Sequence, residues 1–207
     1  MQSNSEQRSD DWKKERYGKF TASEIHKLLG IKALGETGKS FAIEKAIEEL
    51  FGEMEENYIS FDMQNGIDTE PLAFDKFKQL KSLEFLEVTN CNFFPLGLHA
   101  GASPDGLVGT DALLEIKCPK STTFFKLVAT NEIDAKYYAQ MQMQMASTNR
   151  NKAYFFNYLI HEGIEYYHEI IIERNEEMIK KILDRLDEAI EIKKEYINLI
   201  NTNKQWN

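Results

Sequence analysis

The segment GASPDGLVGTDALLEIKCPK, residues 101–120, places an aspartate in a turn and then sets two charged residues into an apolar run. Asp105 lies in the Ser-Pro-Asp-Gly turn, and Glu115 and Lys117 interrupt the apolar run that follows. Because side chains alternate along a strand, Glu115 and Lys117 share one face while their apolar neighbours take the other. Burying a charge is costly unless the charge is paired or holds a metal. The segment therefore predicts a strand that is anchored in the core and presents its charged pair to a cleft.

The spacing of the acidic residues favours a metal site. Asp105 precedes Glu115 by about ten residues, which is enough chain for a hairpin to bring the two carboxylates together. Neighbouring carboxylates repel, and hard oxygen ligands with room for a phosphate suit Mg²⁺, with Mn²⁺ as its substitute. Lys117 could orient or deprotonate an attacking water, or stabilise charge on the phosphate. The alternative is a hairpin turn with a surface salt bridge between strands; the Pro-Asp turn and the flanking apolar residues favour the metal site.

Length and composition bound the class of protein. The 207 residues are 42% hydrophobic and 12% aromatic, so we expect one domain over residues 1–207 with a sizeable core, in which residues 1–9 form a flexible polar leader. No apolar run approaches the ~20 residues of a membrane span, and the first residues are polar. We therefore expect a cytoplasmic protein without a membrane partner, in the host cytoplasm if the chain is phage-encoded. The two cysteines are far apart and suggest neither a zinc site nor a disulfide framework.

The net charge of −9 argues against a nucleic-acid partner, because nonspecific DNA affinity comes mainly from lysine and arginine. The distribution of charge modifies that argument. Basic residues cluster near the start of the chain and around its middle, whereas acidic residues crowd residues 162–195. The pattern is compatible with an acidic outer face and a basic interior groove.

Hydrophobic periodicity predicts a mixed α/β fold with a central mixed sheet flanked by helices. Helical signals are a short helix around Trp12, a Thr21–Glu24 capping box that opens a helix through Leu29, apolar spacing over 43–51 and 74–80, and an amphipathic helix over about 175–200. Strand signals are residues 85–88, 112–118, 153–160 and 165–172, with a turn at 99–106 and a hairpin at 161–163.

One segment carries contradictory signals. In Gln140–Met145 the apolar residues alternate with period two, as in a strand, yet Met, Gln and Ala are good helix formers. We predict a helix there.

A second candidate motif lies at residues 33–40, ALGETGKS, which fits a permissive phosphate-binding loop. Such a loop follows a strand, whereas the segment before this one is predicted to be helical. Ser40 is interpreted as the N-cap of the next helix. We therefore expect no nucleotide cofactor.

The motifs resemble, in this order along the chain, those of the lambda exonuclease family, also called the YqaJ-type viral recombinases, of the PD-(D/E)XK nuclease superfamily. They are WKKERYGKFTASEIH (12–26), NGIDTEP (65–71), GASPDGL (101–107), LLEIKCP (113–119), YYAQMQ (137–142) and YFFNY (154–158). The resemblance covers nearly the whole chain and implies a restriction-endonuclease-like PD-(D/E)XK core.

The resemblance also implies roles for individual residues. Asp105, Glu115 and the backbone carbonyl of Ile116 would bind the metal, and Lys117 would assist the water. Gln140 would be a further active-site residue, on a helix.

Glu70 would reach the same site from another helix, although a solvated helix carboxylate is an equal alternative from its position alone. Pro71 follows Glu70 and removes a helix amide, so we expect a kink there.

The resemblance further implies a site for a 5′-phosphate at Arg16 and Ser23, with Thr21 at the start of the same segment. A helix N-terminus offers free amides, and an arginine adds a bidentate charge. The alternative is a capped helix with a solvent-exposed arginine. Thr123 stands where the family pattern has an arginine, and Lys120 is the candidate substitute for that DNA contact.

The activity that the resemblance implies is a Mg²⁺-dependent 5′→3′ exodeoxyribonuclease acting on ends of double-stranded DNA. It would leave 3′ overhangs for recombination, form a ring-shaped homotrimer and work with a phage-type single-strand annealing protein. The alternatives are a structure- or site-specific endonuclease of the same superfamily and a non-catalytic DNA-binding or assembly protein. The intact Asp105, Glu115 and Lys117 argue against the non-catalytic form.

Overall fold

The computed structural model describes residues 10–30, 33–52 and 61–203, so the predicted leader lies outside the described residues. The helices are α1 (Asp10–Arg16), the 3₁₀ helix η1 (Ala22–Leu28), α2 (Glu36–Phe51), α3 (Phe61–Leu83), α4 (Ser121–Thr130), α5 (Ala135–Thr148) and α6 (Glu176–Asn203). The strands are β1 (Phe20–Thr21), β2 (Val88–Thr89), β3 (Phe94–Leu96), β4 (Ala100–Ala102), β5 (Gly106–Val108), β6 (Ala112–Lys117), β7 (Lys152–His161) and β8 (Ile164–Glu173). Over these residues, no helix combines the length and the apolar character that crossing a membrane requires.

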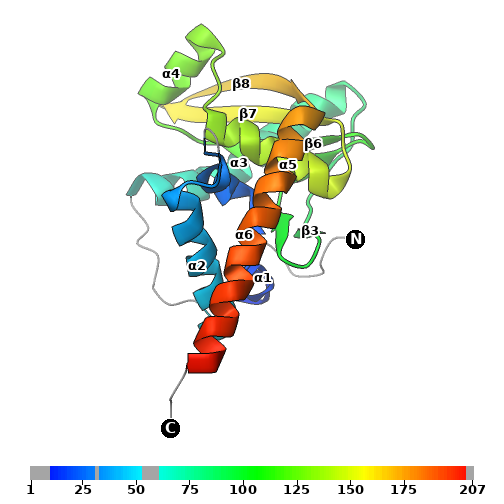
Figure 1. The fold of residues 1–207 in the computed structure, drawn as a ribbon. Helices are drawn as coiled ribbons and strands as arrows, with labels where there is room; N and C mark the ends of the chain where they lie inside the picture. The colour runs from blue at the N-terminus through cyan, green and yellow to red at the C-terminus, as the bar shows by residue number, and fades with distance from the viewer. Residues whose placement is uncertain (1–9, 31–32, 53–60, 204–207) are drawn as a thin grey trace.

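A five-stranded mixed sheet lies at the centre, in the order β2-β5-β6-β7-β8 (Figure 1). Strands β6 and β7 are parallel, with Glu115 opposite Phe155, and the other neighbouring pairs are antiparallel. Parallel neighbours need a crossover connection, which α4 and α5 supply. The predicted mixed α/β class with a central mixed sheet and flanking helices is confirmed.

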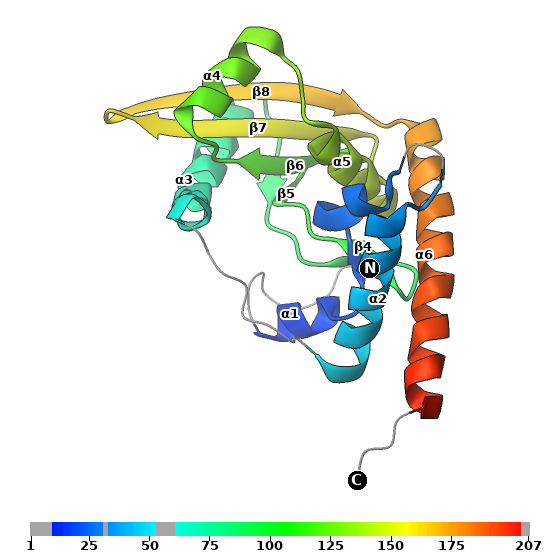
Figure 2. The ribbon, with the colours of Figure 1, turned by 60° about the vertical axis from the view of Figure 1, so that its left-hand side comes forward.

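Helices cover both faces of this sheet (Figure 2). Helix α3 packs through Ala73 and Phe77 against Leu114 and Phe156 on one face. On the other face, α5 and α4 pack against Leu113, Phe155 and their neighbours, as the shared hydrophobic cluster shows. Because residues of β6 alternate between the two clusters, Leu114 and Ile116 face α3 while Glu115 faces α5.

A second layer contains the small sheet, the N-terminal helices and the C-terminal helix. Helices η1, α2 and α6 gather around a small three-stranded sheet, β1-β4-β3, through a cluster that includes Phe20, Phe41 and Ile182. Figure 2 shows α2 and α6 side by side, with α1 near the lower end of α2 and away from the central sheet.

The period-two segment Gln140–Met145 is helical, as predicted. Its alternating pattern arises because α5 is buried on several sides. Two residues advance a helix by about 200°, so alternate residues reach nearly opposite faces. Met141 and Met145 pack on the sheet, whereas Met143 packs against η1 and α6. A helix enclosed by other elements can therefore carry apolar residues in an alternating pattern.

Three local predictions at the start of the chain were wrong in detail. The predicted helix after Thr21 is present, with Thr21 at its N-cap position and Leu29 at its C-cap position, but it is a 3₁₀ helix and the Thr21 side chain makes no capping hydrogen bond. Helix α2 begins at Glu36 with Gly35 as its N-cap, so Ser40 lies inside the helix. The α2 face that is buried carries Phe41, Ala42 and Ala46, and Phe51 of the predicted stripe is half exposed.

The predicted turn at residues 99–106 contains a strand. Strand β4 is the middle strand of the small sheet, and its three residues, Ala-Gly-Ala, are all buried. A Cβ on Gly101 would meet Phe93 at 2.2 Å, so only glycine fits there. Small residues carry no strand signal, which is why the pattern missed it. Helix α4 was likewise not predicted.

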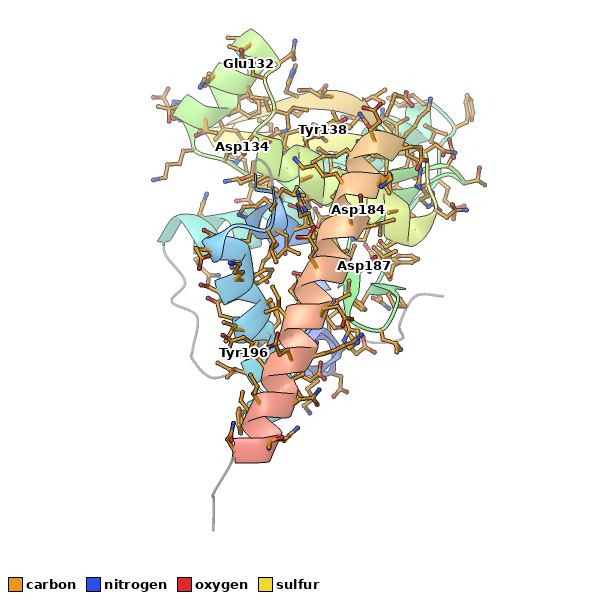
Figure 3. The ribbon with its side chains drawn as sticks, viewed as in Figure 1. Glu132, Asp134, Tyr138, Asp184, Asp187 and Tyr196 are labelled. Carbon is orange, nitrogen blue, oxygen red and sulfur yellow. The ribbon has the colours of Figure 1, made fainter. Side chains whose placement is uncertain are left out.

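The C-terminal predictions are confirmed. Strands β7 and β8 form a hairpin whose turn residues, Glu162 and Gly163, both have positive φ. Helix α6 buries Ile179, Ile182 and Leu186 along one stripe. Its opposite face is acidic and polar, and Figure 3 shows Asp184 and Asp187 on the outward side.

Candidate active site

Asp105 is held beside strand β6 by backbone geometry. It directly precedes β5, which pairs with β6 in an antiparallel hairpin, as the spacing predicted. The Asp105 amide donates to the Leu114 carbonyl at 3.0 Å, and the Asp105 carboxylate accepts from the Ile116 amide at 2.6 Å. The hairpin register thus fixes this carboxylate next to the strand that carries Glu115.

Glu115 is a buried carboxylate with hydrogen-bond donors on both oxygens. It is 1% exposed. Gln140 donates to Oε1 at 2.6 Å, and Gln144 donates to Oε2 at 2.5 Å. Lys117 also contacts Oε1 as an ion pair. The two glutamines are four residues apart, which places them on one face of α5.

The charges in this site are strongly coupled. Burial, followed by the charge of Glu115, raises the pKa of Asp105 well above its ordinary value, and Glu70 adds to the effect. Burial by itself lowers the pKa of Lys117, but Glu115 and Asp105 outweigh burial and raise that pKa above its ordinary value. The metal-free site therefore carries excess negative charge that a cation would neutralise.

A cavity of about 160 Å³ joins these residues to the N-terminal elements. Its lining residues are Trp12, Arg16, Ala22, Ser23, Ser103, Asp105, Glu115, Lys117, Gln140 and Gln144. The structure therefore brings Arg16 and Ser23 together with the predicted catalytic residues.

Arg16 is oriented by its neighbours in this cavity. Its Nη1 donates to the Ser103 hydroxyl at 3.1 Å, and Trp12 Nε1 donates to the same oxygen at 3.2 Å. The Arg16 guanidinium lies 4.1 Å from the centre of the Trp12 ring. Burial lowers the pKa of Arg16 to about 10, with Glu24 opposing the shift, so the arginine is charged at neutral pH.

Glu70 lines a hollow that it shares with Asp105. A second hollow of about 380 Å³ is lined by Glu70, Pro71, Phe74, Asp75, Lys78, Asn90, Asp105 and Ile116. Helix α3 continues through Pro71. Because Asp105 lines both hollows, the two meet at this carboxylate.

Two predicted DNA-binding residues lie outside both hollows. Thr21 is buried, and its hydroxyl contacts the Ser23 hydroxyl at 3.2 Å and Glu24 at 3.5 Å. Lys120 is exposed and is the N-cap residue of α4. Neither residue is among those that line the two hollows.

Sequence reasoning missed Gln144, Ser103 and Trp12. The available signals were positional: Gln144 is four residues after Gln140, Trp12 is four residues before Arg16, and Ser103 precedes the Pro-Asp pair. Because residues four apart share one face of a helix, this spacing could have identified Gln144 and Trp12 from the predicted helices.

The donors present fit a hard divalent cation. Asp105, Glu115 and the Ile116 carbonyl offer oxygens on one short stretch, and oxygen ligands suit Mg²⁺ or Mn²⁺. The Gln144 side-chain oxygen is buried and has no hydrogen-bond partner among the described residues, so an acceptor in this site is left unused. No three acidic, histidine or cysteine side chains converge as a ready-made metal cluster within the described ranges. The groups that could hold a cation here are the Asp105 and Glu115 carboxylates and the Ile116 carbonyl, and Glu70 lines a hollow that also includes Asp105.

The family model of the YqaJ-like viral recombinase domain matches residues 11–151, which include all of these site residues. The chain belongs to the YqaJ-like viral recombinase family. This membership confirms the resemblance that the motifs indicated.

Solved structures extend the comparison. The alkaline exonuclease LHK-Exo from Laribacter hongkongensis superimposes with a TM-score of 0.82 at 29% identity, covering 94% of this chain and 97% of that one. A structure of LHK-Exo in complex with dAMP matches equally well, at 28% identity. A phage-related exonuclease from Haemophilus somnus 129PT shares the fold, with a TM-score of 0.67 at 20% identity over 90% of this chain and 96% of that one.

A curated relative is similar over a shorter region. The ExoD protein of Escherichia coli (strain K12) is 34% identical over 76 residues, which span 32% of this chain and 84% of ExoD.

Proposed function

We propose that this protein is a metal-dependent 5′→3′ exodeoxyribonuclease that degrades one strand of linear double-stranded DNA and leaves 3′ overhangs. Family membership and the likeness to LHK-Exo support a nuclease. The observation that carries the finer proposal is the shared cavity, in which the partly buried Arg16 lies with Asp105 and Glu115. Arg16, which would bind the terminal phosphate, thus lines the same cavity as the acidic residues.

The proposed chemistry needs a divalent cation held by Asp105, Glu115 and the Ile116 carbonyl. Mg²⁺, or Mn²⁺ in its place, would lower the pKa of an attacking water and offset charge on the phosphate. Lys117, whose pKa is raised by the two carboxylates despite its burial, acts as an ammonium that donates hydrogen bonds to the water or the phosphate. Gln140 and Gln144 hold the Glu115 carboxylate in one orientation.

The reaction is hydrolysis of the first phosphodiester bond from the 5′ end. The water oxygen forms a bond to phosphorus, the bond from phosphorus to the 3′ oxygen of the terminal nucleotide breaks, and that oxygen takes up a proton. The products are a nucleoside 5′-monophosphate and a strand with a new 5′-phosphate. Binding of dAMP by LHK-Exo is in keeping with such a product. Each turnover would therefore regenerate the terminal phosphate that Arg16 and Ser23 recognise.

The biological role that we propose is resection for recombination. A 3′ single strand is the substrate for pairing by strand annealing, so the expected partner is a phage-type single-strand annealing protein. The family's description as a viral recombinase supports this role.

The test compares linear with covalently closed circular duplex DNA in Mg²⁺, with EDTA and a Glu115→Gln protein as controls. We expect the linear DNA alone to be degraded, with release of 5′-mononucleotides, early loss of a label at the 5′ end and retention of a label at the 3′ end. Digestion of the circle at a similar rate would identify an endonuclease instead. Binding of DNA without digestion in Mg²⁺ or Mn²⁺ would identify the non-catalytic alternative.

A further inference from the structure

The turn at Gly18, which follows α1, is held in place by contacts with several other elements. Gly18 adopts a φ of +67°, and a Cβ there would meet the Cβ of Glu49 at 2.6 Å, so the turn requires glycine. The Gly18 amide donates to the Glu48 carboxylate at 3.2 Å. A backbone hydrogen bond also closes the turn around Gly18, since the Lys19 amide donates to the Arg16 carbonyl at 3.0 Å. The backbone of Arg16 is thus part of a turn whose position is set by α2.

Helix α6 holds the same turn through a buried ammonium. Lys193 is 0% exposed, and its Nζ donates to the Gly18 carbonyl. The ammonium also pairs with Glu49 and lies 3.3 Å from His99 Nδ1. A fully buried lysine is rare unless it is paired, and the partners here come from α2, the turn and the start of β4.

This contact bears on the cavity because α1 carries two of its lining residues. Trp12 and Arg16 both bond to Ser103, across 91 and 87 residues of sequence. Helix α1 lies away from the central sheet (Figure 2). The position of the Arg16 guanidinium therefore depends on the hydrogen bond to Ser103 and also on the backbone junction of α1 with β1 at Gly18.

We infer that Lys193 is a positioning residue for recognition of the DNA 5′ end, acting from α6 through the Gly18 carbonyl on Arg16. The inference depends on the proposed function. Helix α6 lies beyond residues 11–151, which the family model matches, so no motif of the family identifies Lys193. The C-terminal helix thereby becomes part of the machinery that binds the terminal phosphate, in addition to its packing role.

The test uses the full-length chain with Lys193→Met, and measures kcat and KM on duplexes that carry a 5′-phosphate or a 5′-hydroxyl. Glu49 is 43% exposed in its side chain, so it stays solvated when the ammonium is lost and the variant should fold. A displaced arginine should reduce the phosphate-to-hydroxyl ratio of kcat/KM by roughly tenfold, mostly through KM, since small misplacements of a positioning group are costly. Lys193→Arg, which keeps the charge and the donors, should restore much of the ratio.

Lys194→Met is the matched control. It makes the same charge change on the next residue of α6, where the lysine is exposed and pairs with Glu191 at 2.8 Å. Its phosphate-to-hydroxyl ratio should equal that of the parent. If Lys193→Met is unstable, Glu49→Gln removes only the paired carboxylate and should shift the ratio in the same direction by less.

A double-mutant cycle separates positioning from general stability. If Lys193 acts through Arg16, adding Lys193→Met to Arg16→Ala should change the phosphate-ended rate by less than about twofold. Equal losses on both kinds of end, or additive losses in the cycle, would overturn the positioning role and leave Lys193 as a stabilising residue. A parent ratio near one would refute the terminal-phosphate site and the positioning role with it, whereas a high parent ratio that Lys193→Met retains would refute the positioning role alone.

Discussion

At the scale of single residues, the proposed chemistry depends on Asp105, Glu115 and Lys117. Glu115 is buried with its oxygens occupied by Gln140, Gln144 and Lys117, and Asp105 is fixed to the same strand. In the proposed function, these residues position a water, a metal and a phosphate. We therefore expect substitutions here to affect rate much more than DNA binding.

The first prediction is that Asp105→Ala, Glu115→Ala and Lys117→Ala each lower turnover on the order of a hundredfold or more. DNA affinity, measured by fluorescence anisotropy without Mg²⁺, should change much less. Lys126→Ala, a surface lysine of α4, is the control for loss of a positive charge. A folded Glu115→Ala protein that cuts at the parent rate would contradict the assignment.

The second prediction concerns stability and pH. Because burial and Glu115 raise the folded-state pKa of Asp105, its contribution to stability is full below the unfolded pKa of about 3.8 and is lost as pH rises through the folded pKa. Asp105→Asn keeps an acceptor for the Ile116 amide and removes the charge. The metal-free variant should therefore melt at a higher temperature than the parent at pH 8, with the difference shrinking toward acid pH.

Mg²⁺ provides the complementary measurement for Asp105→Asn. A ligand that binds only the folded state raises the melting temperature, so Mg²⁺ should stabilise the parent and have little effect on the variant. A metal-free variant that is less stable than the parent at pH 8 would show that the carboxylate is not under electrostatic strain.

At the scale of elements, three closely spaced glutamines of α5 make different contacts. Gln140 and Gln144 both point to Glu115. Gln142 instead donates to the Glu173 carbonyl at 2.9 Å and accepts from the Asn175 amide at 2.8 Å, at the junction of β8 and α6. Helical geometry separates residues that the sequence presents as a uniform repeat.

The third prediction follows from that division. Gln144→Leu should lower turnover per folded molecule by about tenfold or more because the orientation of Glu115 is lost. Gln142→Leu should leave two backbone groups unpaired, at a cost of about 1–3 kcal/mol each in free energy of unfolding, with turnover per folded molecule retained. Denaturant unfolding and single-turnover rates on the two variants check this. Equal effects of the two substitutions on turnover would refute it.

At the scale of the whole molecule, the net charge of −9 has to be reconciled with a DNA substrate. The acidic residues Asp184 and Asp187 lie on the outward side of α6 (Figure 3), whereas Arg16 and Lys117 line the interior cavity. An acidic chain can follow DNA processively if a closed assembly surrounds the duplex, because topology then replaces tight binding.

The fourth prediction is therefore a cyclic oligomer, which we propose to be a homotrimer. Light scattering in solution should give three times the 24.0 kDa mass of one chain. The light scattering should be measured at the protein concentration at which degradation is processive. A monodisperse monomer under those conditions would contradict the ring.

Local chemistry made much of the site predictable from sequence. A hairpin register depends on a short stretch of chain, so the spacing of Asp105 and Glu115 was enough to place one carboxylate beside the other. The stripe of α6 and the turn residues of the β7–β8 hairpin are equally local. Residue types and spacing thus determined the fold class, the charged strand and the helix at 140–145.

Tertiary structure alone decided what depends on distant segments meeting. The bond from Trp12 to Ser103 spans 91 residues, and the bond from Lys193 to Gly18 spans 175. No local pattern records such pairings, because a buried lysine in an apolar stripe and a strand of small residues such as β4 look unremarkable until packing gives them neighbours. The sequence by itself determined which chemical groups are available and on which elements they lie. The packing of η1 and α6 against the small sheet, together with the hydrogen bonds from α1 to Ser103, decided that Arg16 lines the same cavity as Asp105 and Glu115, since only the meeting of those distant segments brings the arginine and the carboxylates into one enclosure.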